Sequence, residues 1–155
     1  MMKKKVVIFH AGQAGLAAAQ SIIEKDLASE LVLIDPNDGT LQSKVADLKA
    51  TSDVQGRFMD IRGSIEFANI DDVDFFLLTC PGGPCSAGAP ENDEAIAKAL
   101  PFLRQMATEI GFRAAESTIV VACEPVDLVT FALSKLTKAC KIPLETRRSI
   151  VIPLF

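Results

Sequence analysis

The sequence has no apolar run long enough to cross a membrane. None of its windows reaches the roughly 18 uninterrupted apolar residues that a spanning helix requires. The chain begins with MMKKK, and the apolar stretch that follows is only about four residues long before His10, too short for the core of a secretory signal. We therefore expect no membrane insertion and no secretory leader.

A basic surplus is also missing. Sixteen Lys and Arg residues are scattered among twenty Asp and Glu residues, which gives a formal net charge of −4. Nucleic-acid binding would need a basic face, so we expect no nucleic-acid partner. The four cysteines, Cys80, Cys85, Cys123 and Cys140, show neither C-x-x-C spacing nor the density of a disulfide scaffold. The pattern favours a reducing compartment, the cytoplasm or an organelle interior.

The chain does contain a regular alternation of strand-like and helix-like segments. Its 155 residues, 49% of them hydrophobic, suit one domain over residues 1–155 with no second domain. Short apolar runs predict strands at 5–9, 31–35, 57–62, 73–80, 117–123 and 149–154. Helical spacing occupies 14–23, 41–52, 91–111 and 127–137, with a short helical turn at 65–70 and a Pro/Gly-rich loop at 81–90. This order predicts an α/β fold with a doubly wound, six-stranded parallel sheet.

The junction of the first strand and first helix resembles the G-x-G-x-x-G pattern, with His10, Gly12 and Gly15 at its three glycine positions. In that pattern the first glycine makes a tight turn, the second lets the backbone approach a pyrophosphate, and the third lets helix and strand pack closely. Gly12 and Gly15 preserve the last two properties. His10 replaces the first glycine, and a side chain there tolerates the turn less well than glycine does.

The candidate cofactor-binding residues are those of the turn and the end of the second strand, namely Gly12, Gln13, Ala14, Gly15 and Asp35. Asp35 lies where the pattern places an acid that binds the adenosine ribose, and no arginine follows nearby to hold a 2′-phosphate, so NAD is favoured over NADP if a nucleotide binds. A second interpretation stays open. G-x-x-G also occurs in α/β proteins simply to let a helix pack, and a strand-end acid is often a solvated cap.

Several further motifs extend the likeness over nearly the whole chain. They are KVADL at 44–48, DVD at 72–74 and PVDLVT at 125–130, beside ELVLID at 30–35. With these motifs the chain resembles the NAD-binding domain of the lactate/malate dehydrogenase family. The resemblance implies a Rossmann-type fold, and Cys123, at the end of a predicted strand, joins the candidate cofactor-binding set.

The departures from that family concern its chemistry. The resemblance implies substrate-binding arginines on the loop after the fourth strand, but no arginine occurs between Arg62 and Arg104. Glu124 stands where the family has an asparagine, and a carboxylate there would repel an anionic substrate. The family's acid/base histidine, its aspartate partner and a further arginine would lie in a second domain. The single histidine is His10, so we predict no dehydrogenase activity for this chain.

Three functions remain compatible with these observations. We favour a non-catalytic pseudoenzyme domain that serves as an accessory subunit through a protein partner or a homo-oligomer, because a lone half would expose apolar surface. A sensor of NAD(H) or an adenine nucleotide is the second. The third is the NAD-binding half of a dehydrogenase completed by another chain or truncated here. We expect no metal, since buried cysteines usually act as small hydrophobes; the candidate ligands otherwise are His10, Cys80 and Cys123.

Overall fold

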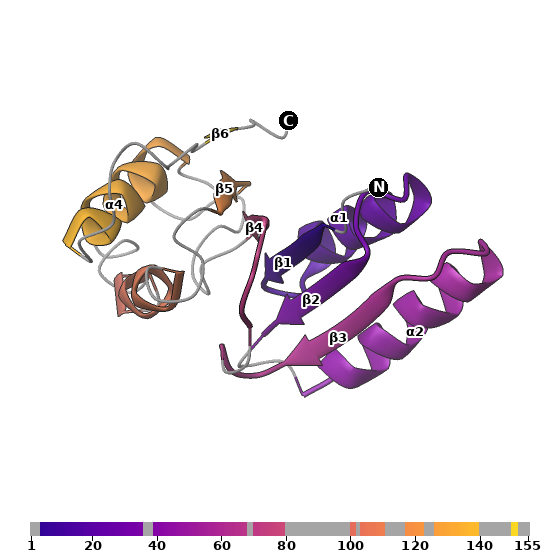
Figure 1. Cartoon of the computed structure of the whole chain (residues 1–155). Helices are drawn as coiled ribbons and strands as arrows, with labels where there is room; N and C mark the ends of the chain where they lie inside the picture. The colour runs from indigo at the N-terminus through magenta and orange to yellow at the C-terminus, as the bar shows by residue number, and fades with distance from the viewer. Residues whose placement is uncertain are drawn as a thin grey trace.

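The computed structural model describes residues 4–35, 39–67, 70–79, 100–101, 103–110, 117–122, 126–139 and 150–151. Their core is a parallel sheet in the order β3-β2-β1-β4-β5-β6 (Figure 1). The strands are β1 Lys5–Phe9, β2 Glu30–Ile34, β3 Asp60–Ser64, β4 Phe75–Leu78, β5 Thr118–Val121 and β6 Ile150–Val151. The expected six-stranded parallel sheet is confirmed, and the strand order reverses between β1 and β4.

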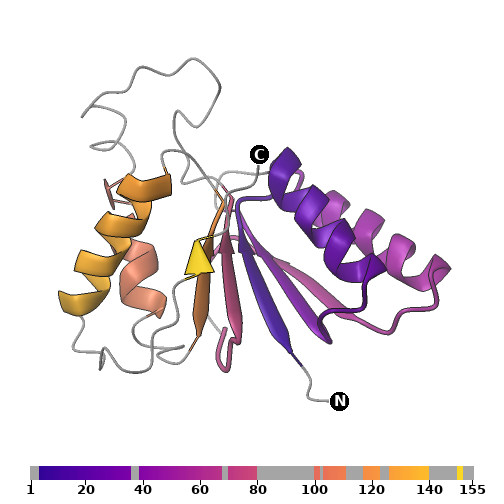
Figure 2. The same cartoon turned by 90° about the horizontal axis from the view of Figure 1, so that it is seen from above.

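Helices cover both faces of this sheet. Figure 2 shows α1 (Gln13–Glu24) and α2 (Leu41–Val54) on one face, and α4 (Val126–Ala139) with the helical residues 103–110 on the other. The doubly wound arrangement is therefore confirmed. Within the helix expected over 91–111, the structure describes residues 100–101 and 103–110, and all of them are helical. None of the helices in these ranges is long and apolar enough to span a bilayer.

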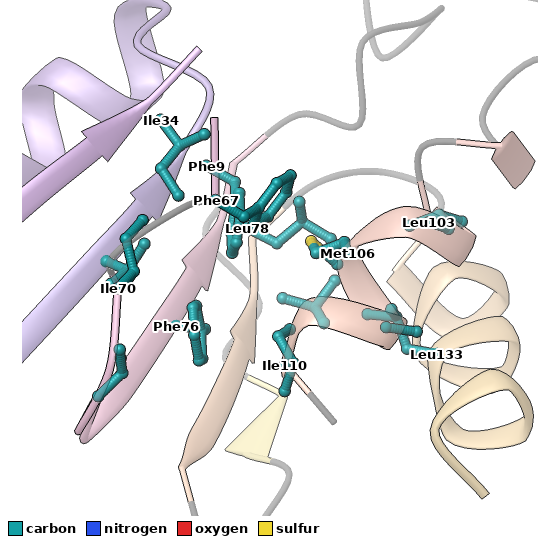
Figure 3. Packing of buried hydrophobic residues seen from close by; sticks show 14 of the residues in the cluster. Phe9, Ile34, Phe67, Ile70, Phe76, Leu78, Leu103, Met106, Ile110 and Leu133 are labelled. Atoms are coloured by element: carbon teal, nitrogen blue, oxygen red, sulfur yellow. The ribbon is translucent and has the colours of Figure 1, made fainter. Parts of the chain in front are cut away.

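Two hydrophobic clusters form because successive strand residues point to opposite faces. From β1, Val6 and Ile8 join the cluster under α1 and α2, whereas Val7 and Phe9 join the other. Figure 3 shows Phe9 and Phe76 on the sheet side of this other cluster, and Met106 and Ile110 on its helical side. The Phe9 ring lies 5.1 Å from that of Phe67 and 5.4 Å from that of Phe76, centroid to centroid. Both faces of β1 are thus buried, which explains its continuous apolar sequence.

Apart from shifts of one or two residues at the ends of other elements, two expected elements differ from the structure. The third strand is Asp60–Ser64 rather than 57–62, because the register pairs Glu30 with Asp60 and leaves Arg57 in the preceding turn. The helical turn expected at 65–70 is wrong for residues 65–67 and 70, which are not helical. There the Ser64 hydroxyl donates to the Glu66 carbonyl at 2.6 Å and accepts its N–H at 3.1 Å, and this local pair of bonds replaces a helical turn.

Candidate functional site at the carboxyl end of β1

The turn from β1 to α1 begins at a strained residue. His10 has φ +73°, in the left-handed region that glycine adopts freely and that costs another residue about 1–2 kcal/mol. Its backbone N–H donates to the Ile34 carbonyl at 2.8 Å, so the end of β2 fixes its position. The expectation that a side chain at this position must adopt a glycine-like conformation is confirmed.

The His10 side chain turns toward Asp35, the residue that follows β2. Its Nδ1 lies 2.8 Å from Asp35 Oδ2, and the Ala11 N–H donates to the same oxygen at 2.9 Å. The Asp35 side chain is only 7% exposed, whereas that of His10 is 36% exposed. The candidate ribose acid is therefore hydrogen-bonded within the protein to the residue that replaces the first glycine.

Gly12 and Gly15 occupy the two remaining glycine positions of the turn. Gly12 is the N-cap residue of α1 and makes no side-chain cap, and the exposed Gln13 and Ala14 begin the helix. Gly15 is buried, and a β-carbon built on it would overlap the His10 carbonyl oxygen. Gly15 is thus required for packing of α1 against β1, as the glycine pattern predicts.

Two residues near the turn were not predicted as site residues. The Thr79 hydroxyl lies 2.7 Å from the Phe9 carbonyl oxygen and 3.0 Å from that of His10. From α2, Lys44 Nζ donates to the Ala11 carbonyl at 2.9 Å. The sequence did contain an indication for Thr79, because it is a polar residue near the end of the apolar strand expected at 73–80. Nothing in the spacing of Lys44 points to the turn.

The remaining predicted site residues lie outside the described ranges. These are Cys80 and Cys123, and the other two cysteines, the 81–90 loop, Glu124 and Pro125 lie outside as well. The strand order does place β1, β4 and β5 side by side, as the interpretation with His10, Cys80 and Cys123 as metal ligands requires. Among the residues that are described, no three His, Cys, Asp or Glu side chains gather in a way that could hold a metal ion.

Two carboxyl groups with shifted pKa values, those of Glu30 and Asp74, lie at the amino ends of the strands, away from the glycine turn. A hydrogen bond from Lys5, with the nearby charges of Lys5 and Arg62, lowers the pKa of Glu30 despite partial burial. Burial opposes ionisation of Asp74, but hydrogen bonds from the Lys4 side chain and the Lys5 N–H outweigh it and lower its pKa. These groups join the amino ends of β1, β2 and β4, so their role is structural and separate from the turn.

Comparison with known proteins identifies the family. Residues 4–142 match the model of the lactate/malate dehydrogenase NAD binding domain. The chain belongs to this family. Malate dehydrogenase of Salinibacter ruber is 28% identical over 127 residues, which are 82% of this chain and 40% of the relative. Malate dehydrogenase of Staphylococcus saprophyticus is 30% identical over 137 residues, which are 87% of this chain and 43% of the relative.

Solved structures agree with this assignment. The S. ruber malate dehydrogenase structure superimposes with a TM-score of 0.72 at 25% identity, over 86% of this chain and 41% of that one. Lactate dehydrogenase from Eimeria maxima, solved with NADH and oxamate, gives a TM-score of 0.80 at 18% identity, over 97% of this chain and 44% of that one, and shows the fold alone. The chain spans about two fifths of the length of these relatives.

The turn of this family member fits NAD only in part. The uncapped start of α1 and the glycine at position 12 suit a pyrophosphate. The His10 ring, however, lies beside Gly12: a β-carbon built on Gly12 would lie 3.4 Å from its Cε1 and 3.6 Å from its Nδ1. The same ring is hydrogen-bonded to Asp35. In this arrangement the His10 ring occupies space beside Gly12 that a pyrophosphate would approach, so the residues present fit the dinucleotide only in part.

Proposed function

We propose that the chain acts as a non-catalytic lactate/malate dehydrogenase-type domain, an accessory subunit that works through a protein partner or a second copy of itself. The position of its single histidine carries this proposal, because His10 lies in the glycine turn, where the pattern places a pyrophosphate and not a keto-acid substrate. The chain therefore has no other imidazole to protonate such a substrate. The lack of arginine between Arg62 and Arg104 removes the bidentate guanidinium contact that would hold a substrate carboxylate there.

Exposed apolar side chains support the contact with a partner. Phe58 is fully exposed and Val54 is 89% exposed, and the two flank the turn between α2 and β3. Leu27, 56% exposed, follows α1, and the Arg57 guanidinium in the same turn reaches back to the end of α1 through the Glu24 carbonyl at 3.3 Å. Contiguous exposed apolar groups usually mark a site of protein contact, and we propose that Leu27, Val54 and Phe58 form one such surface.

A turnover assay tests the absence of catalysis. Oxidation of millimolar NADH with pyruvate or with oxaloacetate should equal that of buffer. Turnover that disappears in Gly12→Val would contradict the proposal and favour the dehydrogenase interpretation.

Sedimentation velocity tests the mode of association. If the wild-type chain is a dimer and Phe58→Ser is a monomer, the exposed apolar surface around Phe58 binds a second copy of the chain. A wild-type monomer would leave a different protein as the partner.

A sensor of NAD(H) is the second candidate, favoured by the uncapped N-terminus of α1 and the glycine at its N-cap. Calorimetric titration with NADH distinguishes it. Micromolar binding that Asp35→Ala abolishes would establish the sensor, and no binding at millimolar NADH would exclude it.

A further inference from the structure

One imidazole ring contacts both parts of the turn that a dinucleotide would use. In the glycine pattern, the second glycine lies against the pyrophosphate and the acid after the second strand binds the adenosine ribose. Here the His10 ring lies beside Gly12, at van der Waals distance from where a β-carbon on that residue would be, and its Nδ1 is 2.8 Å from Asp35 Oδ2. Phosphate and ribose contacts would both require the space that this ring fills.

We propose that His10 is a built-in block of the nucleotide site, a side chain that keeps dinucleotides from the turn. The inference rests on the proposed function, since a non-catalytic domain has no need of a bound cofactor. It goes beyond that function because it attributes the loss of affinity for a dinucleotide to one side chain, that of His10. The rest of the turn stays competent, because Gly12 leaves the start of α1 without a side-chain cap and Gly15 lets α1 pack against β1.

The block is held on both sides. The His10 backbone is fixed by the Ile34 carbonyl through its N–H and by the Thr79 hydroxyl at its own carbonyl. The ring is fixed by the Asp35 carboxylate, which is nearly buried and also accepts the Ala11 N–H. Rotation of the ring away from the turn would remove a hydrogen bond from a buried carboxylate, so an incoming ligand must replace that bond to bind.

The decisive experiment is a gain of function in His10→Gly. Glycine adopts φ +73° without strain, so this variant should fold and open the site. NADH titration by calorimetry should show at least tenfold tighter binding than wild type. The double variant His10→Gly/Asp35→Ala should lose the gain, since the recovered affinity would come from the released carboxylate. A gain of less than twofold, or wild-type binding already in the micromolar range, would overturn the block.

A second measurement uses the wild-type protein. Because the chain has one histidine, its ring signals in ¹⁵N-correlated NMR spectra need no assignment. The block predicts a protonated, hydrogen-bonded Nδ1 whose signal does not move with millimolar NADH. A saturable shift at micromolar NADH would overturn the inference.

The results of these experiments distinguish a failure of the proposed block from a failure of the proposed function. Tighter NADH binding by His10→Gly without pyruvate- or oxaloacetate-dependent turnover supports both. Turnover by the wild-type chain would overturn the proposed function and, because turnover requires bound NADH, the block with it. Failure of His10→Gly to gain NADH affinity would overturn the block alone.

Discussion

The carbonyl oxygen of His10 occupies the place where a β-carbon on residue 15 would have to lie, so Gly15 of α1 packs directly against the end of β1. The strained φ of His10 and the absence of a side chain at Gly15 are therefore two parts of one close contact. Thr79, the residue that follows β4, lies against the same carbonyl and completes the junction.

Gly15→Ala should lower the free energy of unfolding by at least about 2 kcal/mol, because the added methyl group overlaps backbone and forces α1 away from the sheet. Urea denaturation followed by circular dichroism measures this loss. Gly39→Ala is the matched control, since a β-carbon there meets no atom within 4 Å, and it should change stability by less than about 0.5 kcal/mol. Equal stability of the two variants would contradict the close contact.

Thr79→Val should cost about 1–2 kcal/mol, because it keeps the shape of the buried side chain but removes the hydroxyl that bonds to the Phe9 and His10 carbonyls. Thr79→Ser retains the hydroxyl and should lose less. Comparison of the two denaturation midpoints checks this, and a valine variant as stable as the serine variant would show that the hydroxyl contributes nothing.

Phe9→Ala should destabilise the fold by about 3–5 kcal/mol, because Phe9 is fully buried between the rings of Phe67 and Phe76. Phe58→Ala provides the control, since Phe58 is fully exposed and its removal should change stability by less than about 0.5 kcal/mol in the monomer. Thermal unfolding of both variants distinguishes the positions. Similar melting temperatures would mean that the described core is wrong.

Acid should lower the stability contributed by the ion pairs of Glu30 at the amino ends of the strands. Glu30 accepts from Lys5 at 2.7 Å and from Arg62 at 2.8 Å, and its pKa is lowered from the ordinary 4.5. A lowered folded-state pKa contributes stability above the unfolded-state value, and that stability is lost as pH falls through the folded-state pKa. Glu30→Gln should therefore be less stable than wild type at pH 7, by up to about 1 kcal/mol for such a partly exposed pair.

The difference between Glu30→Gln and wild type should shrink below about pH 4.5 and vanish once wild-type Glu30 is protonated. Urea titrations at pH 7 and across the acid range provide the test. The exposed Glu24, replaced as Glu24→Gln, controls for a general loss of negative charge. A difference that grows toward low pH would contradict the sign of the shift.

The apolar pattern of β1 and β2 was sufficient to predict the central strands, because residues buried on both faces of a parallel sheet form continuous apolar runs. The third strand was predicted to begin three residues too early, at 57 instead of 60. Its Arg62, Gly63 and Ser64 carry little strand signal, and pairing with β2 decides where the strand lies. Non-local pairing of this kind is not visible in the local sequence.

For the site, the sequence identified His10 and Asp35 separately, each from its place in the glycine pattern. Their hydrogen bond joins residues 25 positions apart, and it depends on the left-handed backbone of His10, which aims the ring at the end of β2. The contact of Lys44 with the turn likewise depends on how α2 packs against the sheet. Spacing alone could not place these side chains against one another.

The position of β1 in the middle of the sheet has a consequence for folding. β2 follows β1 closely in the chain, but β4 must return to it across about 70 residues, the separation of the Lys4–Asp74 ion pair. Closing so long a loop is slow compared with forming α1 or α2. Until it closes, one hydrogen-bonding edge of an apolar strand is open to other chains. Refolding yield should therefore fall as protein concentration rises, even though the finished sheet keeps this strand in its interior.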